Sequence, residues 1–389
     1  MNPPRTRRPL GLRALALLAA ILALAPNPGA KRHGMILKVD PSQPAAFQTI
    51  GQAVAAARQF DTIDISPSGN PYRECVDVRR RFDLRITAAG GRARIDATGA
   101  CPSSQPAFGI SLSRHVIVQN VDLAGNPAGA GFLVDHSGDI RFAGVTASGF
   151  SGCGLVSTLS VVGLFVDLSR FTDNPGGGLC LNGNGFWITN TATDRNGNGG
   201  IVLQGVAGGV AMNVFVNRLI AGPDEPAGIA PQPPAGLHNV FVARSTFGTR
   251  GLPAGAGAEG ITGAGRNLQV DRSYFYGMGI HASANGSLTG NVVTDCVGPG
   301  FALGPGPLSM ILSSNTAQGC TGPGFDLAGA FAYRNRSGGN GGGGLVAGDG
   351  VFLEQNAASV NGGAGISRTG TDNGGRRNTS TDPVPADFR

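Results

Sequence analysis

The segment 296–327, CVGPGFALGPGPLSMILSSNTAQGCTGPGFDL, contains one phrase twice. Cys296-Val-Gly-Pro-Gly-Phe301 returns 24 residues later as Cys320-Thr-Gly-Pro-Gly-Phe325. A glycine followed by a large apolar residue recurs in this way along most of the chain, at Gly109-Ile110, Gly131-Phe132, Gly154-Leu155, Gly178-Leu179, Gly200-Ile201, Gly228-Ile229, Gly260-Ile261, Gly279-Ile280, Gly300-Phe301, Gly324-Phe325, Gly344-Leu345 and Gly365-Ile366. Nine of the eleven spacings lie between 19 and 24 residues, so the chain consists of repeats of about 22 residues.

A repeat of about 22 residues matches one coil of a parallel β-helix, in which short strands are joined by turns. A leucine-rich repeat has a similar period, but leucine is too sparse here, and a propeller blade needs about twice the length. Glycine and proline total 65 and 25 of 389 residues, which suits a tight turn in every unit. The sequence therefore predicts an all-β protein, a right-handed parallel β-helix of about twelve coils over residues 109–368.

A second strand is expected in the middle of each unit, and several of these strands end in asparagine. Asparagine tolerates the left-handed backbone of a tight bend, and its side chain can bond to its copies in adjacent coils. We therefore expect an internal asparagine ladder formed by Asn120, Asn190, Asn291, Asn315, Asn335 and Asn356.

The two ends of the mature chain differ from the repeats. Residues 31–108 are expected to form an N-terminal cap and the first coils, with a strand at Ile36 to Val39. Phe47, Ile50 and Val54 follow the spacing of an amphipathic helix, which would cover the open end of the β-helix core. Residues 369–389 are polar and unpatterned, and we expect a flexible tail.

Residues 1–30 have the pattern of an export signal, in which a basic start precedes an apolar run. The run is too short for a confident membrane span, so we expect no stable span after cleavage and a secreted or periplasmic protein. Removing its four arginines leaves 26 basic against 24 acidic residues, which disfavours nucleic acid as a partner.

Six cysteines in an exported chain permit disulfides. Cys296 and Cys320 each lie four residues before a coil-opening glycine, so they should stack in adjacent coils within reach of each other. The remaining pairs are expected to be Cys75 with Cys101 and Cys153 with Cys180. None of these spacings fits a metal site.

The capped entry from Ile36 to about Asn120, with the glycine–apolar and asparagine-ended strands after it, resembles the pectin-lyase-like superfamily, in particular its right-handed β-helix repeat proteins. The resemblance implies a polysaccharide partner and covers nearly the whole mature chain. The family includes lyases, C5-epimerases, hydrolases, esterases and non-catalytic surface proteins. The motifs of the alginate epimerases and polygalacturonases are missing, and so is a recognisable calcium-binding carboxylate cluster. No catalytic residue carries over, and calcium is expected only if the protein is a lyase.

Arg218, Arg244 and Arg272 each follow the second strand of three successive coils. Equivalent positions in adjacent coils lie about 5 Å apart, where three guanidinium groups repel one another unless an anion lies between them. A uronate carboxylate would suit this role, because arginine binds it through two hydrogen bonds. The alternative is structural ion pairing with Asp271, or with Asp224 and Glu225 from one of the two longer units.

His281 follows Tyr274 and Tyr276, and by alternation from Ile280 it points outward. An imidazole near arginine is a candidate acid or base for β-elimination or epimerisation, where a proton leaves the sugar carbon beside a neutralised carboxylate. The catalytic candidates are therefore Arg244, Asp271, Arg272 and His281. The alternative is that His281 is an ordinary surface histidine.

Phe165, Trp187, Phe215 and Phe241 each occupy the middle of a strand with aliphatic neighbours. If those neighbours face the core, the four aromatic side chains stack on the outside. Such a row could bind sugar rings, or it could be covered by loops or by a neighbouring subunit. We take Arg218, Trp187, Phe215, Phe241 and Tyr274 as substrate-binding candidates.

The functional hypothesis is an extracytoplasmic β-helix that binds or modifies an acidic polysaccharide, by lyase or epimerase chemistry if it is an enzyme. The alternative is a non-catalytic surface or periplasmic scaffold, in which the aromatic row contacts another protein. The sequence leaves both the enzymatic status and the oligomeric state open.

Overall fold

The computed structural model describes residues 34–102, 104–125, 129–205, 212–223, 225–233, 235–251, 258–305 and 309–382. The expected export signal lies outside these residues. The chain divides into two units after Gly34, and the description below concerns the second unit.

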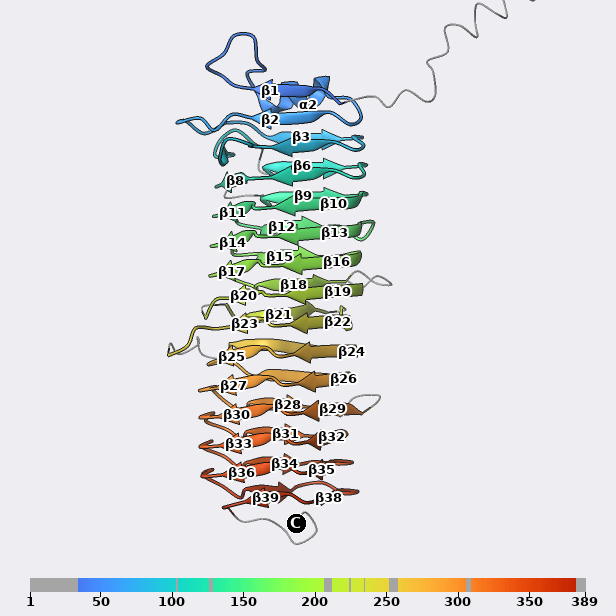
Figure 1. Cartoon of the computed structure of the whole chain (residues 1–389), viewed down its shortest axis with the longest axis vertical. Helices are drawn as coiled ribbons and strands as arrows, with labels where there is room; N and C mark the ends of the chain where they lie inside the picture. The colour runs from blue at the N-terminus through green and yellow to red at the C-terminus, as the bar shows by residue number, and fades with distance from the viewer. Residues whose placement is uncertain are drawn as a thin grey trace, which may run out of the picture. The chain divides into compact units, whose positions relative to one another are not determined.

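The strands form three walls that run the length of the β-helix (Figure 1). Wall A contains β1 (Ile36–Val39), β2 (Thr62–Ile65), β4 (Arg85–Thr87), β7 (Ile117–Gln119), β10 (Gly138–Ala143), β13 (Val162–Asp167), β16 (Asn184–Thr189), β19 (Met212–Asn217), β22 (Leu237–Ala243), β29 (Met310–Ser313), β32 (Ala330–Tyr333), β35 (Phe352–Glu354) and β38 (Gly374–Arg376). Wall B contains β3 (Val76–Arg79), β6 (Phe108–Ser111), β9 (Phe132–Asp135), β12 (Cys153–Ser157), β15 (Gly177–Leu181), β18 (Ile201–Gln204), β21 (Ala227–Gln232), β28 (Phe301–Leu303), β31 (Phe325–Leu327), β34 (Leu345–Ala347) and β37 (Ile366–Arg368).

Two long strands, β24 (Glu259–Asp271) and β26 (Ile280–Thr289), belong to walls A and B at once and join them into one sheet of 26 strands. Wall C is a separate sheet of 13 strands: β5 (Ala93–Asp96), β8 (Val121–Ala124), β11 (Thr146–Ser148), β14 (Arg170–Thr172), β17 (Ala192–Asp194), β20 (Ile220–Ala221), β23 (Thr246–Phe247), β25 (Tyr274–Tyr276), β27 (Val292–Thr294), β30 (Thr316–Gln318), β33 (Arg336–Gly338), β36 (Ala357–Ser359) and β39 (Thr379–Ser380).

Each coil runs from wall B to wall A to wall C and then enters wall B of the next coil, as in β12, β13, β14 and β15. In the described part of the chain the paired strands are parallel, for example β13 with β16 and β14 with β17. The predicted right-handed parallel β-helix is therefore confirmed. Its interior is a continuous apolar core that includes stacked phenylalanines, such as Phe301 and Phe325 with ring centroids 4.7 Å apart.

The glycine–apolar repeat marks the start of the wall B strands. The apolar members lie in register, so Phe132 pairs with Leu155 and Leu345 pairs with Ile366. Glycine precedes them because the coils approach closely there: a Cβ on Gly344 would lie 2.3 Å from the carbonyl oxygen of Gly365. The prediction that Gly109-Ile110 opens the first repeat is wrong, because Phe108, and not Ile110, pairs with Phe132.

The asparagine ladder exists in the second half of the β-helix. Asn291, Asn315, Asn335, Asn356 and Asn378 are buried, and each of the first four side chains donates from Nδ2 to Oδ1 of the next at 2.9–3.1 Å. Asn120 and Asn190 were wrongly assigned to it. They occupy the left-handed bend itself, one residue before the ladder position, where the backbone φ is 57° and 47°.

The cap and the disulfides follow the sequence expectation. Helix α2 (Ile50–Ala56) begins after Thr49, whose side chain accepts a hydrogen bond from the amide of Gln52. The three predicted disulfides, Cys75–Cys101, Cys153–Cys180 and Cys296–Cys320, are all formed. The expected flexible tail is shorter than predicted, because residues 369–382 contribute β38, β39 and Asn378.

Candidate functional site

The three arginines occupy equivalent positions at the bend between walls A and C. The preceding valines, Val216, Val242 and Val270, pair in register, so the arginines stack in successive coils. All three have a left-handed backbone, with φ of 55°, 49° and 44° for Arg218, Arg244 and Arg272, and all are exposed. We call these residues the arginine ridge.

Ion pairing explains only one member of the ridge. The Nε of Arg272 lies 2.7 Å from Oδ2 of Asp271 in a partly exposed pair. Among the described residues, Arg218 and Arg244 have no carboxylate oxygen within 4.0 Å. Asp224 lies outside the described residues.

Glu225 does not neutralise the ridge as expected, because its side chain points into the core. It is 1% exposed and accepts hydrogen bonds from Nδ2 of Asn196 at 2.7 Å and from the hydroxyl of Thr193 at 3.1 Å. Burial raises the pKa of this carboxyl to about 8, against the opposing effect of the two hydrogen bonds. Glu225 thus ends a second buried ladder, in which Nδ2 of Asn174 donates to Asn196.

Phe165, Trp187, Phe215 and Phe241 form one column on the outside of wall A, as their strand register requires. Trp187 is 40% exposed and Phe165 36%. The rings stack in two pairs, Phe165 on Trp187 at 4.6 Å and Phe215 on Phe241 at 5.1 Å, with nearly parallel planes. Sugar rings usually pack on the faces of aromatic rings. Within each stacked pair of this column, one face of each aromatic ring is covered by the other ring, so the rings offer mainly their edges to a ligand.

Tyr274 lies apart from this column. It is the first residue of β25 on wall C, two residues after Arg272, and is 48% exposed. The arginine ridge therefore lies between the aromatic column of wall A and Tyr274 on wall C. Arg218, Phe215 and Phe241 share one stretch of surface, which Tyr274 borders from the opposite side of the bend.

His281 is on the outside of wall B, beside an open groove of about 540 Å³ that Thr262, Ser283 and Asp326 also line. Its Nδ1 lies 2.8 Å from Oε1 of Glu259, and its Nε2 lies 3.2 Å from the carbonyl oxygen of Pro299. The hydrogen bond with Glu259 raises the pKa of His281 and lowers that of Glu259. Because both ring nitrogens face acceptors, the protonated imidazole can donate a hydrogen bond from each of them.

The four catalytic candidates therefore lie in two places. Arg244, Asp271 and Arg272 are at the ridge, whereas His281 pairs with Thr262 at the other end of the same strand pair. Thr262 is on wall B and Asp271 is at the end of wall A, nine residues further along β24. Sequence proximity misled here because β25 on wall C lies between Arg272 and the start of β26. Glu259, the partner of His281, was missed because it lacks any distinguishing sequence pattern.

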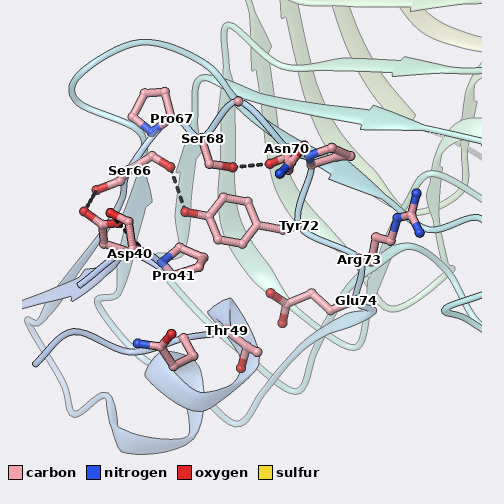
Figure 2. Close-up of a pocket in the computed structure, with 14 residues that line it drawn as sticks. Asp40, Pro41, Thr49, Ser66, Pro67, Ser68, Asn70, Tyr72, Arg73 and Glu74 are labelled. Carbon is pink, nitrogen blue, oxygen red and sulfur yellow. Dashed lines mark hydrogen bonds between the residues drawn. The ribbon is translucent and has the colours of Figure 1, made fainter. Parts of the chain in front are cut away.

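A further pocket of about 810 Å³ lies at the N-terminal cap (Figure 2). Its floor is Tyr72, whose hydroxyl donates to the carbonyl oxygen of Ser66 at 2.7 Å and whose pKa burial raises to about 12. The acidic side chains have structural partners: Asp40 accepts from Ser42 and Ser66, and Glu74 accepts from the first amides of α2. The polar groups of this pocket thus hold the cap together.

Two absences concern the described part of the chain. No group of three or more His, Cys, Asp or Glu side chains is arranged to hold a metal ion. Within the same residues, no helix has the length and hydrophobicity needed to cross a membrane.

No protein-family model and no curated protein matches this chain. Solved structures with the same fold include the receptor-binding tailspike of bacteriophage Det7, with 14% identity, a TM-score of 0.46 and coverage of 97% of this chain and 79% of that one. The catalytic domain of a GH87 alpha-1,3-glucanase matches at 13% identity and a TM-score of 0.46, over 90% and 71% of the two chains. The A-module of the Azotobacter vinelandii mannuronan C-5 epimerase AlgE6 matches at 13% identity and 0.42, over 86% and 94%.

Proposed function

We propose that the protein binds an acidic polysaccharide outside the cytoplasm, through the arginine ridge. The observation that supports this proposal is that Arg218, Arg244 and Arg272 stack in register at the exposed bend. Neighbouring guanidinium groups at the coil spacing of ~4.8 Å repel each other by about 1 kcal/mol even in bulk water. A polymer that places a carboxylate near each guanidinium removes this repulsion, and the coil spacing is close to the length of one sugar unit.

The same left-handed bend follows the wall A strand in twelve successive coils. Asn120, Gly144, Asn190 and Gly290, which suit this backbone, occupy it in four coils, and Leu168, Ser314, Arg334, Gln355 and Arg377 occupy it in five others. Among these twelve bends, arginine stands in three successive coils at Arg218, Arg244 and Arg272. Three disulfides fit an oxidising compartment, where such polymers are found.

The proposal concerns binding, and the catalytic candidates remain predictions. Lyase or epimerase chemistry at the ridge needs a base, but Asp271 is paired with Arg272 and His281 is on another wall. Calcium likewise remains an expectation tied to a lyase. An assay for unsaturated uronate products, with and without calcium, tests that chemistry separately.

The test is equilibrium binding of polygalacturonate, alginate and hyaluronate to the mature protein, with Arg244→Ala and the matched control Arg79→Ala. Arg79 is exposed on wall B, so its removal changes the net charge equally and leaves the ridge intact. Loss of one partly exposed ion pair of about 1 kcal/mol weakens binding roughly fivefold. We expect this for Arg244→Ala only, with affinity falling as salt rises. Equal losses in both variants, or no binding of any polyuronate, would remove the ridge as the binding site and favour the scaffold alternative.

A further inference from the structure

The outer column of wall A extends beyond its four aromatic residues. Strand register continues it through two polar residues into a second apolar block: Phe165, Trp187, Phe215, Phe241, Gln269, Ser287, Ile311, Phe331 and Phe352. Ile311 is 50% exposed, and Phe331 stacks on Phe352 at 5.7 Å. We call these nine residues the outer row.

The outer row is nearly palindromic. A two-fold axis that lies in the plane of the interface, parallel to the strands of wall A and midway between the levels of Gln269 and Ser287, brings Gln269 of one copy opposite Ser287 of the other. The same axis brings Phe241 opposite Ile311 of a second copy, Phe215 opposite Phe331, and Trp187 opposite Phe352. Because every coil has the same rise whatever the number of residues in its turns, the match holds from Trp187 to Phe352. Phe165, at the end of the row, meets Gly374, which follows Phe352 in the same column.

We propose that two copies of this chain associate antiparallel through wall A, with the outer row at the centre of the interface. A second copy fits this surface because it presents apolar side chains at the same spacing and in the complementary order, which a partner of different architecture would not. An interface that maps onto itself by a two-fold axis is the commonest arrangement of protein dimers.

The dimensions agree with a weak, specific dimer. At ~4.8 Å per coil the row is roughly 40 Å long, and a strip one strand wide with its rim buries on the order of 600 Å² per copy. The total of about 1,200 Å² lies at the lower end of specific interfaces, where weak and transient complexes are found. The arginine ridge lies at the bend beside wall A, so this proposal and the proposed function can fail separately.

The first test is sedimentation velocity of the mature protein from about 1 to 100 µM, a range suited to a weak complex. The double variant Phe215→Ser/Phe331→Ser removes one aromatic contact on each side of the axis. The control is Ile220→Ser, which removes an exposed apolar side chain from wall C, away from the outer row. We expect the wild type and the control to dimerise and the double variant to dissociate at least about tenfold more readily. A wild type that is monomeric throughout, or a control that dissociates as readily as the double variant, overturns the proposal.

The second test fixes the orientation without disturbing the aromatic residues. All six cysteines are in disulfides, so an introduced cysteine is the only free thiol. A short bis-maleimide should link two Ser287→Cys chains, because Ser287 lies beside the two-fold axis. Arg141→Cys, one coil before Phe165 in the same column, should not link, because its copy lies roughly 50 Å away. Linking of Arg141→Cys, or no linking of Ser287→Cys, would exclude the antiparallel dimer.

Discussion

Glu225 should make the free energy of unfolding depend on pH, and Glu225→Gln should remove that dependence. The carboxyl is buried, hydrogen-bonded to Asn196 and Thr193, and has a pKa raised by burial to about 8. Glutamine has the same shape: its carbonyl can accept from Asn196, and its amide can donate to the Thr193 hydroxyl. The substitution therefore keeps the contacts and removes only the titration.

The sign follows from the two protonation states. Below the ordinary glutamate pKa of 4.5, the carboxyl is protonated in both folded and unfolded chains, and its full stability is present. Between pH 4.5 and about 8 only the unfolded chain releases the proton, so stability falls by about 1.4 kcal/mol per pH unit. At pH 7 the accumulated loss is about 3 kcal/mol, and it levels off above the folded pKa.

Urea unfolding of the wild type and Glu225→Gln at intervals from pH 4.5 to 9 measures this effect. We expect the two proteins to be nearly equal at the acidic end and the variant to gain an increasing advantage up to about pH 8. Asp326→Asn serves as the control, because it removes a charge from an exposed position. A constant difference between Glu225→Gln and the wild type across this range would show that the carboxyl titrates normally and refute the reasoning.

Three other substitutions test the packing of the coils and the hydrogen-bonded pair of Glu259 and His281 on wall B. Asn335→Ala removes a buried side chain with ladder bonds to Asn315 and Asn356, and should lower the free energy of unfolding by about 2–4 kcal/mol. Gln355→Ala, at a partly exposed position outside the ladder, should change it little, and an equal effect of the two substitutions in urea unfolding would contradict the ladder's role. Gly344→Ala would place a Cβ 2.3 Å from the carbonyl oxygen of Gly365 in the next coil, and should lower the free energy of unfolding by about 1–3 kcal/mol. The Cβ of Gly69→Ala would meet no atom within 4 Å, so this control should leave the free energy of unfolding nearly unchanged. Unchanged stability of Gly344→Ala in urea unfolding would disprove the close approach. Glu259→Gln should lower the pKa of His281 in an NMR titration, because the hydrogen bond with Glu259 raises it. In the wild type this pair adds stability below pH 6.5 and loses it as pH rises through the raised pKa of His281, and the variant should lack this contribution. An unchanged pKa of His281 in the variant would rule out the hydrogen bond.

The sequence predicted the fold because a β-helix repeats the same physical requirement in every coil. Gly131 and Gly344 are needed wherever one backbone passes close to the next, so their spacing reports the coil length. The same period aligned Cys296 with Cys320 and Phe165 with Trp187. Local composition was less reliable at the start of the repeat, where Ala107-Phe108, without glycine, occupies the position that Gly109-Ile110 was expected to hold.

The site was predicted less completely, because it depends on which wall each residue reaches. Arg218, Arg244 and Arg272 were placed together correctly, since they follow the same strand in successive coils. His281 was placed beside them, but β25 on wall C separates Arg272 from the wall B position of His281.

The sequence alone determined the period of this protein, hence its coils, its disulfide pairs and the columns of side chains that stack along it. Only the tertiary structure decided the direction of individual side chains at the turns. Glu225 turned into the core, Asn120 and Asn190 took the bend instead of the ladder, and Glu259 met His281 across two coils. The physical reason is that the period follows from backbone packing, which every coil repeats, whereas these orientations depend on contacts between particular coils that occur once.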